Sequence, residues 1–225
     1  MDVVLVPGAN HGGWWYRPVV EELEARGHRA HAVTLDGLDP ADPEPDRLIT
    51  LDTHVRQLVD VVSALPGPAV VLGHSYAGSV LSGAADVVPD RFRSLLYVDA
   101  FVPDDGESCW SMTLPWEREW FVEGSGRTGA YVDPLPFFDD RADAHPLATL
   151  TQRSRLTGAW RTVADKHYVL AASAEWAARS PFVAVADRLR ADPSWVVHDL
   201  DETHNVLRTG PDALVGVLDR VLGSA

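Results

Sequence analysis

The stretch VVLGHSYAGSVL, residues 70–81, decides the fold of this chain. An apolar run ends at Gly73, Ser75 follows two positions later, and Ala77 and Gly78 precede a second apolar run. A buried strand that turns sharply into a helix needs small residues there, and the strained turn exposes the serine hydroxyl at the carboxyl edge of a sheet. The usual pattern is G-x-S-x-G, from which Ala77 departs by one methyl group. Ser75 is therefore a candidate nucleophile, and the alternative is that it only caps the helix.

Strand-like and helix-like segments alternate along the chain. Between the strand-like runs, apolar residues recur at helical spacing. Short runs rich in valine and leucine predict strands that are buried on both faces. These runs lie at residues 3–6, 30–35, 69–72, 95–98, 168–171 and 195–200. The alternation predicts an α/β fold in one domain over residues 1–225, with a mainly parallel sheet of about six strands and helices on both faces.

One segment, from about residue 103 to residue 166, breaks this alternation. It shows no clear strand, and it is rich in aromatic residues and prolines. A strandless stretch of this length is more often a functional insertion than a plain loop. We expect a small cap in which Trp110, Trp116 and Trp120 line an apolar substrate pocket. The alternative is that these aromatic side chains only pack on the core.

Composition and charge argue against several classes of protein. The 225 residues carry a formal net charge of −14, which disfavours binding to nucleic acid or to anionic membranes. The single cysteine, Cys109, cannot form an intrachain disulfide, and no Cys/His pair has the spacing of a zinc site. The first residues do not resemble a signal peptide, and no apolar run is long enough to span a membrane. We expect a cytoplasmic protein that is a monomer or a homodimer.

A serine nucleophile requires a base, which in this fold follows the last strand. After residues 195–200 the sequence reads DETHNVLRTG, so His204 lies in the loop before the final helix. The other histidines lie beside earlier strands, in a helix or in the expected cap, and fit this role less well. Among them, His11 and His74 are expected to line the pocket.

Two carboxylates compete for the residue that orients the base. Glu175 follows the next-to-last strand, which is the usual place, whereas Asp99 ends the strand directly after the nucleophile. The role requires geometry rather than a fixed position in the chain. Asp99 is favoured because it is short and held by its strand, while the longer Glu175 side chain must fold back at an entropic cost.

Two backbone N–H groups are expected to form an oxyanion hole. One belongs to Tyr76, directly after the candidate nucleophile. The other comes from the loop VPGANHGGWW after the first strand, where Gly8 allows the turn and Ala9 is the candidate donor. The alternative is that the glycines of this loop only shape a tight connection. The loop lacks the glycine and lysine pattern of a phosphate site.

Several segments together resemble one group of proteins, the bacterial esterase branch of the α/β-hydrolase superfamily, close to plant methyl-salicylate esterases and hydroxynitrile lyases. They are LVPGANHGGWWYRPV, LDTHVRQLVDVV, VLGHSYAGSVLSGAAD, SLLYVDAFVPDDGES and THNVLRTGPDAL. The resemblance implies a Ser75–His204 pair, an oxyanion hole at Ala9 and Tyr76, and no metal or organic cofactor. Some esterases of this branch carry an aspartate at the position of Asp99, which favours that residue as the acid.

The resemblance implies a serine hydrolase that cleaves a small ester or lactone, with an apolar or aromatic body, through an acyl-enzyme. The chain departs from the branch where Pro7 replaces a histidine and Asn10 replaces a residue that is often aromatic. A lyase or cyclase is an alternative, but hydroxynitrile lyases need a lysine near the catalytic histidine, and the only lysine, Lys166, lies well before His204. A non-catalytic receptor for a small molecule is a third reading, because this fold also serves as a hormone receptor.

Overall fold

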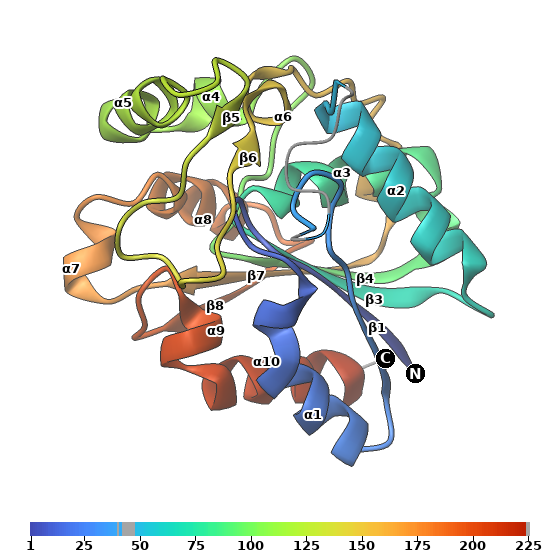
Figure 1. The fold of residues 1–225 in the computed structure, drawn as a ribbon. Coiled ribbons are helices and arrows are strands. Elements are labelled where there is room, and N and C mark those ends of the chain that lie inside the picture. Colours follow the sequence, from blue (N-terminus) through green and yellow to red (C-terminus); the bar gives the residue numbers. More distant parts are fainter. Residues whose placement is uncertain (40, 42–47, 224–225) are drawn as a thin grey trace.

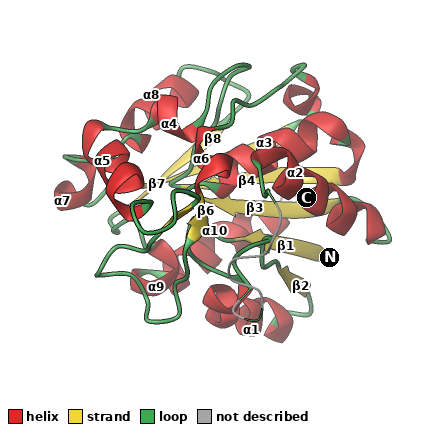
Figure 2. Ribbon diagram, turned by 45° about the horizontal axis from the view of Figure 1, so that its top comes forward, coloured by secondary structure: helices red, strands yellow, loops and turns green. Residues whose placement is uncertain are grey.

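Six parallel strands form one sheet in this computed structural model, which describes residues 1–39, 41 and 48–223. Their order is β2-β1-β3-β4-β7-β8 (Figures 1 and 2). The strands are β1 (Asp2–Val6), β2 (Arg29–Ala32), β3 (Ala69–His74), β4 (Phe92–Val98), β7 (Asp165–Ala171) and β8 (Val196–Leu200). The chain reverses its direction of travel across the sheet between β1 and β3, and ligands bind at such switch points in open α/β sheets. The expected parallel sheet is confirmed.

Helices cover both faces of the sheet, as expected (Figure 1). On one face α1 (Arg17–Ala25) contacts α10 (Pro211–Gly223), and on the other lie α2 (Leu51–Ala64), α3 (Ala77–Val87) and α8 (Phe182–Arg190). In α1, α2 and α8 the buried residues recur at three- and four-residue spacing, so each of these helices packs one face against the sheet, whereas α3 is buried on almost all sides. Within the described residues, no helix has both the length and the apolar character needed to cross a membrane.

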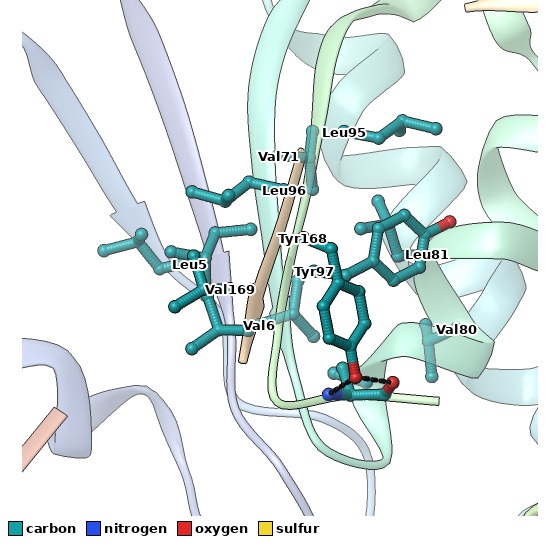
Figure 3. Packing of buried hydrophobic residues seen from close by; sticks show 14 of the residues in the cluster. Leu5, Val6, Val71, Val80, Leu81, Leu95, Leu96, Tyr97, Tyr168 and Val169 are labelled. Carbon is teal, nitrogen blue, oxygen red and sulfur yellow. Dashed lines mark hydrogen bonds between the residues drawn. The ribbon is translucent and has the colours of Figure 1, made fainter. Parts of the chain in front are cut away.

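The core lies along the central strands, which are buried on both faces. Every residue of β1 and β3 is buried. Figure 3 shows how Leu5, Leu96 and Tyr168 pack in this core. The Tyr168 hydroxyl donates a hydrogen bond to the Ala100 carbonyl (2.9 Å) and accepts one from the Ala100 N–H (3.2 Å). This double contact fixes the backbone just beyond the carboxyl end of β4.

Most of the chain between β4 and β7, residues 99–164 and here called the β4–β7 segment, lies at one end of the sheet (Figure 1). It contains α4 (Cys109–Met112), α5 (Pro115–Gly124), α6 (Leu147–Thr151) and η3 (Ala159–Thr162). It also contains two short strands, β5 (Tyr131–Val132) and β6 (His145–Pro146), which pair antiparallel. The sequence did not indicate these strands, because two residues are too few to show an alternating pattern.

Short helical turns complete the structure and connect the larger elements. They are η1 (Gly13–Tyr16), η2 (Pro89–Arg91), α7 (Ala174–Ala177) and α9 (Val206–Thr209). Two of them matter for the site. The turn α7 follows β7, and α9 follows the loop after β8, so both begin near the carboxyl edge of the sheet.

Candidate active site

Ser75 lies in the sharp turn between β3 and α3. Its φ of 54° is in the left-handed region, which is strained for a serine. The turn is held by its own backbone, because the Ser75 N–H donates to the Val98 carbonyl (3.2 Å) and the Ser75 carbonyl accepts from the N–H groups of Gly78 and Phe101 (3.1 Å each). A Cβ atom on Gly78 would lie 2.0 Å from the Phe101 carbonyl oxygen. The close approach explains why small residues follow the serine.

Two further side chains meet Ser75 at the carboxyl edge of the sheet. His204 Nε2 lies 3.1 Å from Ser75 Oγ, and His204 Nδ1 lies 2.7 Å from Asp99 Oδ2. Asp99 directly follows β4, and His204 lies in the loop between β8 and α9. Glu175, the other candidate acid, is exposed on α7 and takes no part in this group. The arrangement of hydroxyl, imidazole and carboxylate is the one that an activated serine requires.

Asp99 is buried and is held by several N–H groups. Its φ of 42° is strained, and its own N–H donates to the Val169 carbonyl (2.7 Å). Its Oδ1 accepts from the Ala171 N–H (3.2 Å), and its Oδ2 accepts from Trp176 Nε1 (2.7 Å). Burial raises the pKa of Asp99 to about 8, and the hydrogen bonds from Trp176 and Ala171 offset only part of this rise. The N–H donors favour the charged form of the carboxylate beside His204, against the effect of burial.

His204 lies between aromatic rings that fix its orientation. Its ring stacks on Trp176 (centroids 4.8 Å apart) and on Phe182 (5.4 Å), and His74 Nε2 donates to its backbone carbonyl (2.9 Å). Burial lowers the pKa of His204, which favours the neutral ring that a general base needs. Since Nδ1 donates its proton to Asp99, Nε2 is left to accept the proton of the Ser75 hydroxyl.

The two residues expected to form the oxyanion hole lie beside Ser75. Ala9 and Tyr76 line the same cavity as the serine. Among the residues that the structure describes, neither backbone N–H group donates to a protein acceptor. A Cβ atom on Gly8 would lie 2.9 Å from Ser75 Cβ, so glycine is needed for the loop after β1 to come this close. Both N–H groups are thus available to an oxygen bound next to Ser75.

Buried hydrogen bonds hold the peptide group between Ala9 and Asn10. Its carbonyl accepts from His11 Nδ1 (2.8 Å), and its N–H donates to His145 Nδ1 in β6 (3.3 Å). His145 Nε2 in turn donates to Thr149 Oγ1 (2.8 Å). The loop after β1 is therefore fastened to the β4–β7 segment.

Asn10 makes further contacts with that segment. Its φ of 65° is in the left-handed region, where asparagine is tolerated better than most residues. Its Nδ2 donates to the carbonyls of Val132 (2.9 Å) and Asp143 (2.7 Å), and its own carbonyl accepts from the Asp143 N–H (2.9 Å). This accounts for an asparagine at a position where the resemblance led us to expect an aromatic residue.

Tyr76 is held by a second set of buried groups. Its hydroxyl donates to His54 Nδ1 (2.8 Å), and His54 Nε2 donates to the Asp36 carbonyl (2.9 Å). Burial lowers the pKa of His54 and of His145, so each neutral ring has one donor and one acceptor, which its neighbours satisfy. The rings of Tyr76 and His145 are in edge contact (4.7 Å), which brings the two sets of hydrogen bonds together.

Ser75 opens into a cavity of about 200 Å³. Four of the five residues expected in the pocket line it, namely His11, His74, Trp116 and Trp120. Many of the other lining residues are aromatic, and these come mainly from the loop after β1, the β4–β7 segment and the turns after β7 and β8. They include Trp15, Phe101, Phe121, Phe138 and Trp176.

Trp110 does not line this cavity, which corrects the expectation for that residue. Its neighbour Cys109 in the short helix α4 is buried, with its Sγ 3.4 Å from Ser79 Oγ. Successive residues of a helix point about 100° apart, so Trp110 faces another way. It lines a separate hollow with Leu147 and Thr151.

Two residues of the site were missed in the sequence. Trp176 follows Glu175. Its position shortly after β7 indicates that its side chain lies near the carboxyl edge of the sheet, where Asp99 also lies. Glu117 lies four residues before Phe121, so both share the buried face of α5, and both line the cavity. A glutamate at the start of a helix is usually a capping residue, so the sequence alone does not single out Glu117.

Comparison with known proteins agrees with the fold. The sequence profile described as "Alpha/beta hydrolase family" matches residues 3–220. The chain is 32% identical over 235 residues to a carbendazim hydrolyzing esterase of Nocardioides sp. (strain SG-4G), covering 95% of this chain and 96% of that protein. It is 37% identical over 109 residues to methylesterase 2 of Arabidopsis thaliana, covering 47% of this chain and 41% of that one.

Among solved structures, one similar fold is that of an extracellular alpha/beta-hydrolase from a Paenibacillus species. The TM-score is 0.83 at 20% identity, with 98% of each chain covered. That protein is described as sharing structural and functional homology with tobacco salicylic acid binding protein 2. The expected resemblance to esterases of this superfamily, plant methylesterases among them, is confirmed. The chain belongs to the alpha/beta hydrolase family.

Proposed function

We propose that this protein is a serine hydrolase that cleaves a small ester or lactone with an apolar or aromatic body. The observation that carries the proposal is the contact of His204 with both partners, 3.1 Å from Ser75 Oγ and 2.7 Å from Asp99 Oδ2. The esterase relatives support ester hydrolysis in general.

In the first half of the proposed reaction, Ser75 Oγ attacks the ester carbonyl carbon and His204 Nε2 takes the hydroxyl proton. Asp99 stabilises the imidazolium that forms. The N–H groups of Ala9 and Tyr76 donate to the oxygen that becomes negatively charged. When the intermediate collapses, the carbon–oxygen bond to the leaving alcohol breaks and His204 returns the proton to that oxygen.

In the second half, water hydrolyses the acyl group on Ser75. His204 takes a proton from the attacking water, and the carbon–oxygen bond to Ser75 breaks as the proton passes to Oγ. The acid product leaves, and the free serine is restored. No redox partner is needed, because every proton and electron pair is exchanged among substrate, water and these side chains.

The cavity supports a small substrate. Its volume of about 200 Å³ is below the ~300–1,000 Å³ usual for drug-sized ligands. Aromatic rings line most of it, which suits a flat apolar body. In this proposal the β4–β7 segment acts as the cap, because Trp116 and Trp120 of α5 close the cavity opposite the sheet.

The lyase alternative is disfavoured by the position of the single lysine. Lys166 Nζ donates to the carbonyls of Val163 (2.6 Å) and Arg161 (3.3 Å), and it does not line the cavity of Ser75. A lysine that assists the chemistry would have to lie near His204. A receptor that only binds a small molecule would not need the contact between Ser75 and His204.

Replacing the serine tests the proposal. Ser75→Ala should lower kcat for any hydrolysed ester by roughly 10³-fold or more, because the nucleophile is removed. The measurement is a screen of aryl and alkyl esters of different acyl length, with thermal unfolding to check the fold. Ser63→Ala, at an exposed position on α2, is the control and should change neither kcat nor the thermal unfolding. If Ser75→Ala turns over esters as fast as the wild type, the proposal is contradicted and acid–base chemistry is favoured. If the wild type binds a ligand but hydrolyses no ester, a receptor is favoured.

A further inference from the structure

Glu117 brings a carboxyl group to a cavity that is otherwise mainly aromatic. It lies on α5, its exposed fraction is 7%, and it lines the cavity with Trp116, Trp120 and Phe121 of the same helix. Glu119, two residues further on, lies on the exposed side of α5. The Glu117 side chain therefore points inward, toward the space in front of Ser75.

One oxygen of this carboxyl group is used by the protein, and the other is available. Oε2 accepts from the Leu114 N–H (2.9 Å) at the start of α5. In the described part of the chain no group donates to Oε1. Oε1 is also not one of the buried side-chain atoms that lack a hydrogen-bond partner, so it is not shut off from solvent. Arg118 does not pair with Glu117, because its guanidinium donates to the carbonyls of Trp110 (2.9 Å) and Thr113 (2.9 Å).

Capping alone does not explain a glutamate at this position. The pKa of Glu117 is raised to about 7, because burial and, less strongly, the nearby charge of Asp99 raise it more than the Leu114 N–H and the charge of Arg118 lower it. A glutamine would cap the Leu114 N–H as well, without the cost of placing an ionisable group in an apolar cavity. The cost is offset when a ligand donates a hydrogen bond to the free oxygen.

We infer that Glu117 is a specificity-determining residue that accepts a hydrogen bond from an N–H group on the aromatic body of the substrate. The aromatic walls hold a flat ring, and Oε1 receives an N–H in or on that ring. The substrate class is therefore a small ester of an aromatic acid or alcohol that carries such a nitrogen, as in anilines, indoles and azoles. This inference rests on the proposed hydrolase function and concerns the part of the substrate remote from the ester.

A pair of esters that differ only at the nitrogen tests the inference. Methyl indole-5-carboxylate has the N–H, and its 1-methyl analogue lacks it. At pH 8, where the Glu117 carboxylate is mostly charged, we expect the wild type to prefer the N–H ester by about tenfold or more in kcat/KM, the size of one hydrogen bond to a charged group. Glu117→Gln, which keeps the cap, should reduce this ratio, and Glu117→Leu should bring it close to one. Glu119→Gln is the matched control and should keep the wild-type ratio.

Binding provides a second measurement that does not depend on turnover. In a Ser75→Ala background, the Kd of each ester is measured by quenching of tryptophan fluorescence, with and without Glu117→Gln. Loss of the N–H preference with Glu117→Gln supports the inference, even where the wild type hydrolyses no ester and the proposed function fails. An unchanged ratio in Glu117→Gln and Glu117→Leu overturns it, as does failure of both esters to bind. Thermal unfolding identifies a Glu117→Leu protein that does not fold, in which case Glu117→Gln decides.

Discussion

At Asp99 the backbone and the side chain are constrained together. The positive φ turns the side chain toward His204, and the Tyr168 hydroxyl holds Ala100 in place behind it. The sequence alone predicted that Ser75, His204 and Asp99 lie together. Ser75 and Asp99 directly follow strands, His204 lies in the loop after β8, and the ends of parallel strands share one edge. The sequence was not sufficient to find Trp176 as the donor to Asp99, because the direction of an indole depends on packing between distant segments.

Removing the charge of Asp99 should cripple the enzyme. In Asp99→Asn the amide group cannot accept from His204 Nδ1–H as the carboxylate does, so the wrong tautomer is populated and Nε2 no longer accepts the serine proton. We expect kcat to fall by ~10⁴, the size of this change in a related triad. Glu175→Gln, which alters the exposed alternative, should have a mild effect. If kinetics with one good ester substrate show that Asp99→Asn keeps most of its activity, Asp99 is not the residue that orients His204.

At the scale of elements, α3 does more than begin at Ser75. Asp86, in its last turn, accepts from the N–H groups of Thr157 (2.6 Å), Gly158 (2.9 Å) and Trp160 (3.2 Å) at the start of η3. The helix thus fixes the point where the β4–β7 segment returns to the sheet. Helical periodicity predicted α3, but it says nothing about a contact between residues more than 70 positions apart.

Loss of the Asp86 carboxylate should lower stability in a pH-dependent way. Burial raises the pKa of Asp86, but the hydrogen bonds from Thr157 and Trp160 outweigh it and hold the pKa below its ordinary value. The stabilisation is therefore present above the pKa of an unfolded aspartate, ~3.9, and is lost as the pH falls through the lower folded value. We expect Asp86→Ala to lower the free energy of unfolding by about 1–2 kcal/mol at neutral pH, a partly exposed site giving less than a buried one.

Urea unfolding at neutral and acid pH measures this effect. Asp90→Ala, at an exposed position in η2, is the control and should change the free energy of unfolding little. A difference between Asp86→Ala and wild type that is as large in acid as at neutral pH would show that the carboxylate charge is not responsible.

At the scale of the whole molecule, the cavity is built by segments that lie far apart in the sequence. The loop after β1, the helix α5 and the loops after β7 and β8 all contribute to it. The break in the α/β alternation predicted which segment covers Ser75. It did not separate Trp110 from Trp116 and Trp120, because their orientation follows from how α4 and α5 pack on the sheet.

Substitution of these tryptophans tests whether the β4–β7 segment determines which substrates fit. Trp116→Ala and Trp120→Ala should change the relative kcat/KM among esters of different size by roughly tenfold, since each removes a wall of the cavity. Trp110→Ala is the control, because that side chain faces another hollow, and it should leave the ranking unchanged. Kinetics are compared with melting temperatures. A lower melting temperature with an unchanged ranking would mean that Trp116 and Trp120 act only as core residues.

The contacts of Asn10 mean that the cap is not an independent module. Its backbone and side chain contact His145, Val132 and Asp143, so the loop that contains Ala9 takes its shape from the β4–β7 segment, the proposed cap. A chimera that keeps Asn10, but receives residues 131–145 from a relative with a different residue at position 145 or a different backbone path, would leave these groups without their partners. Recombination within the family therefore has to exchange the loop and the cap together, although more than 120 residues separate them in the chain.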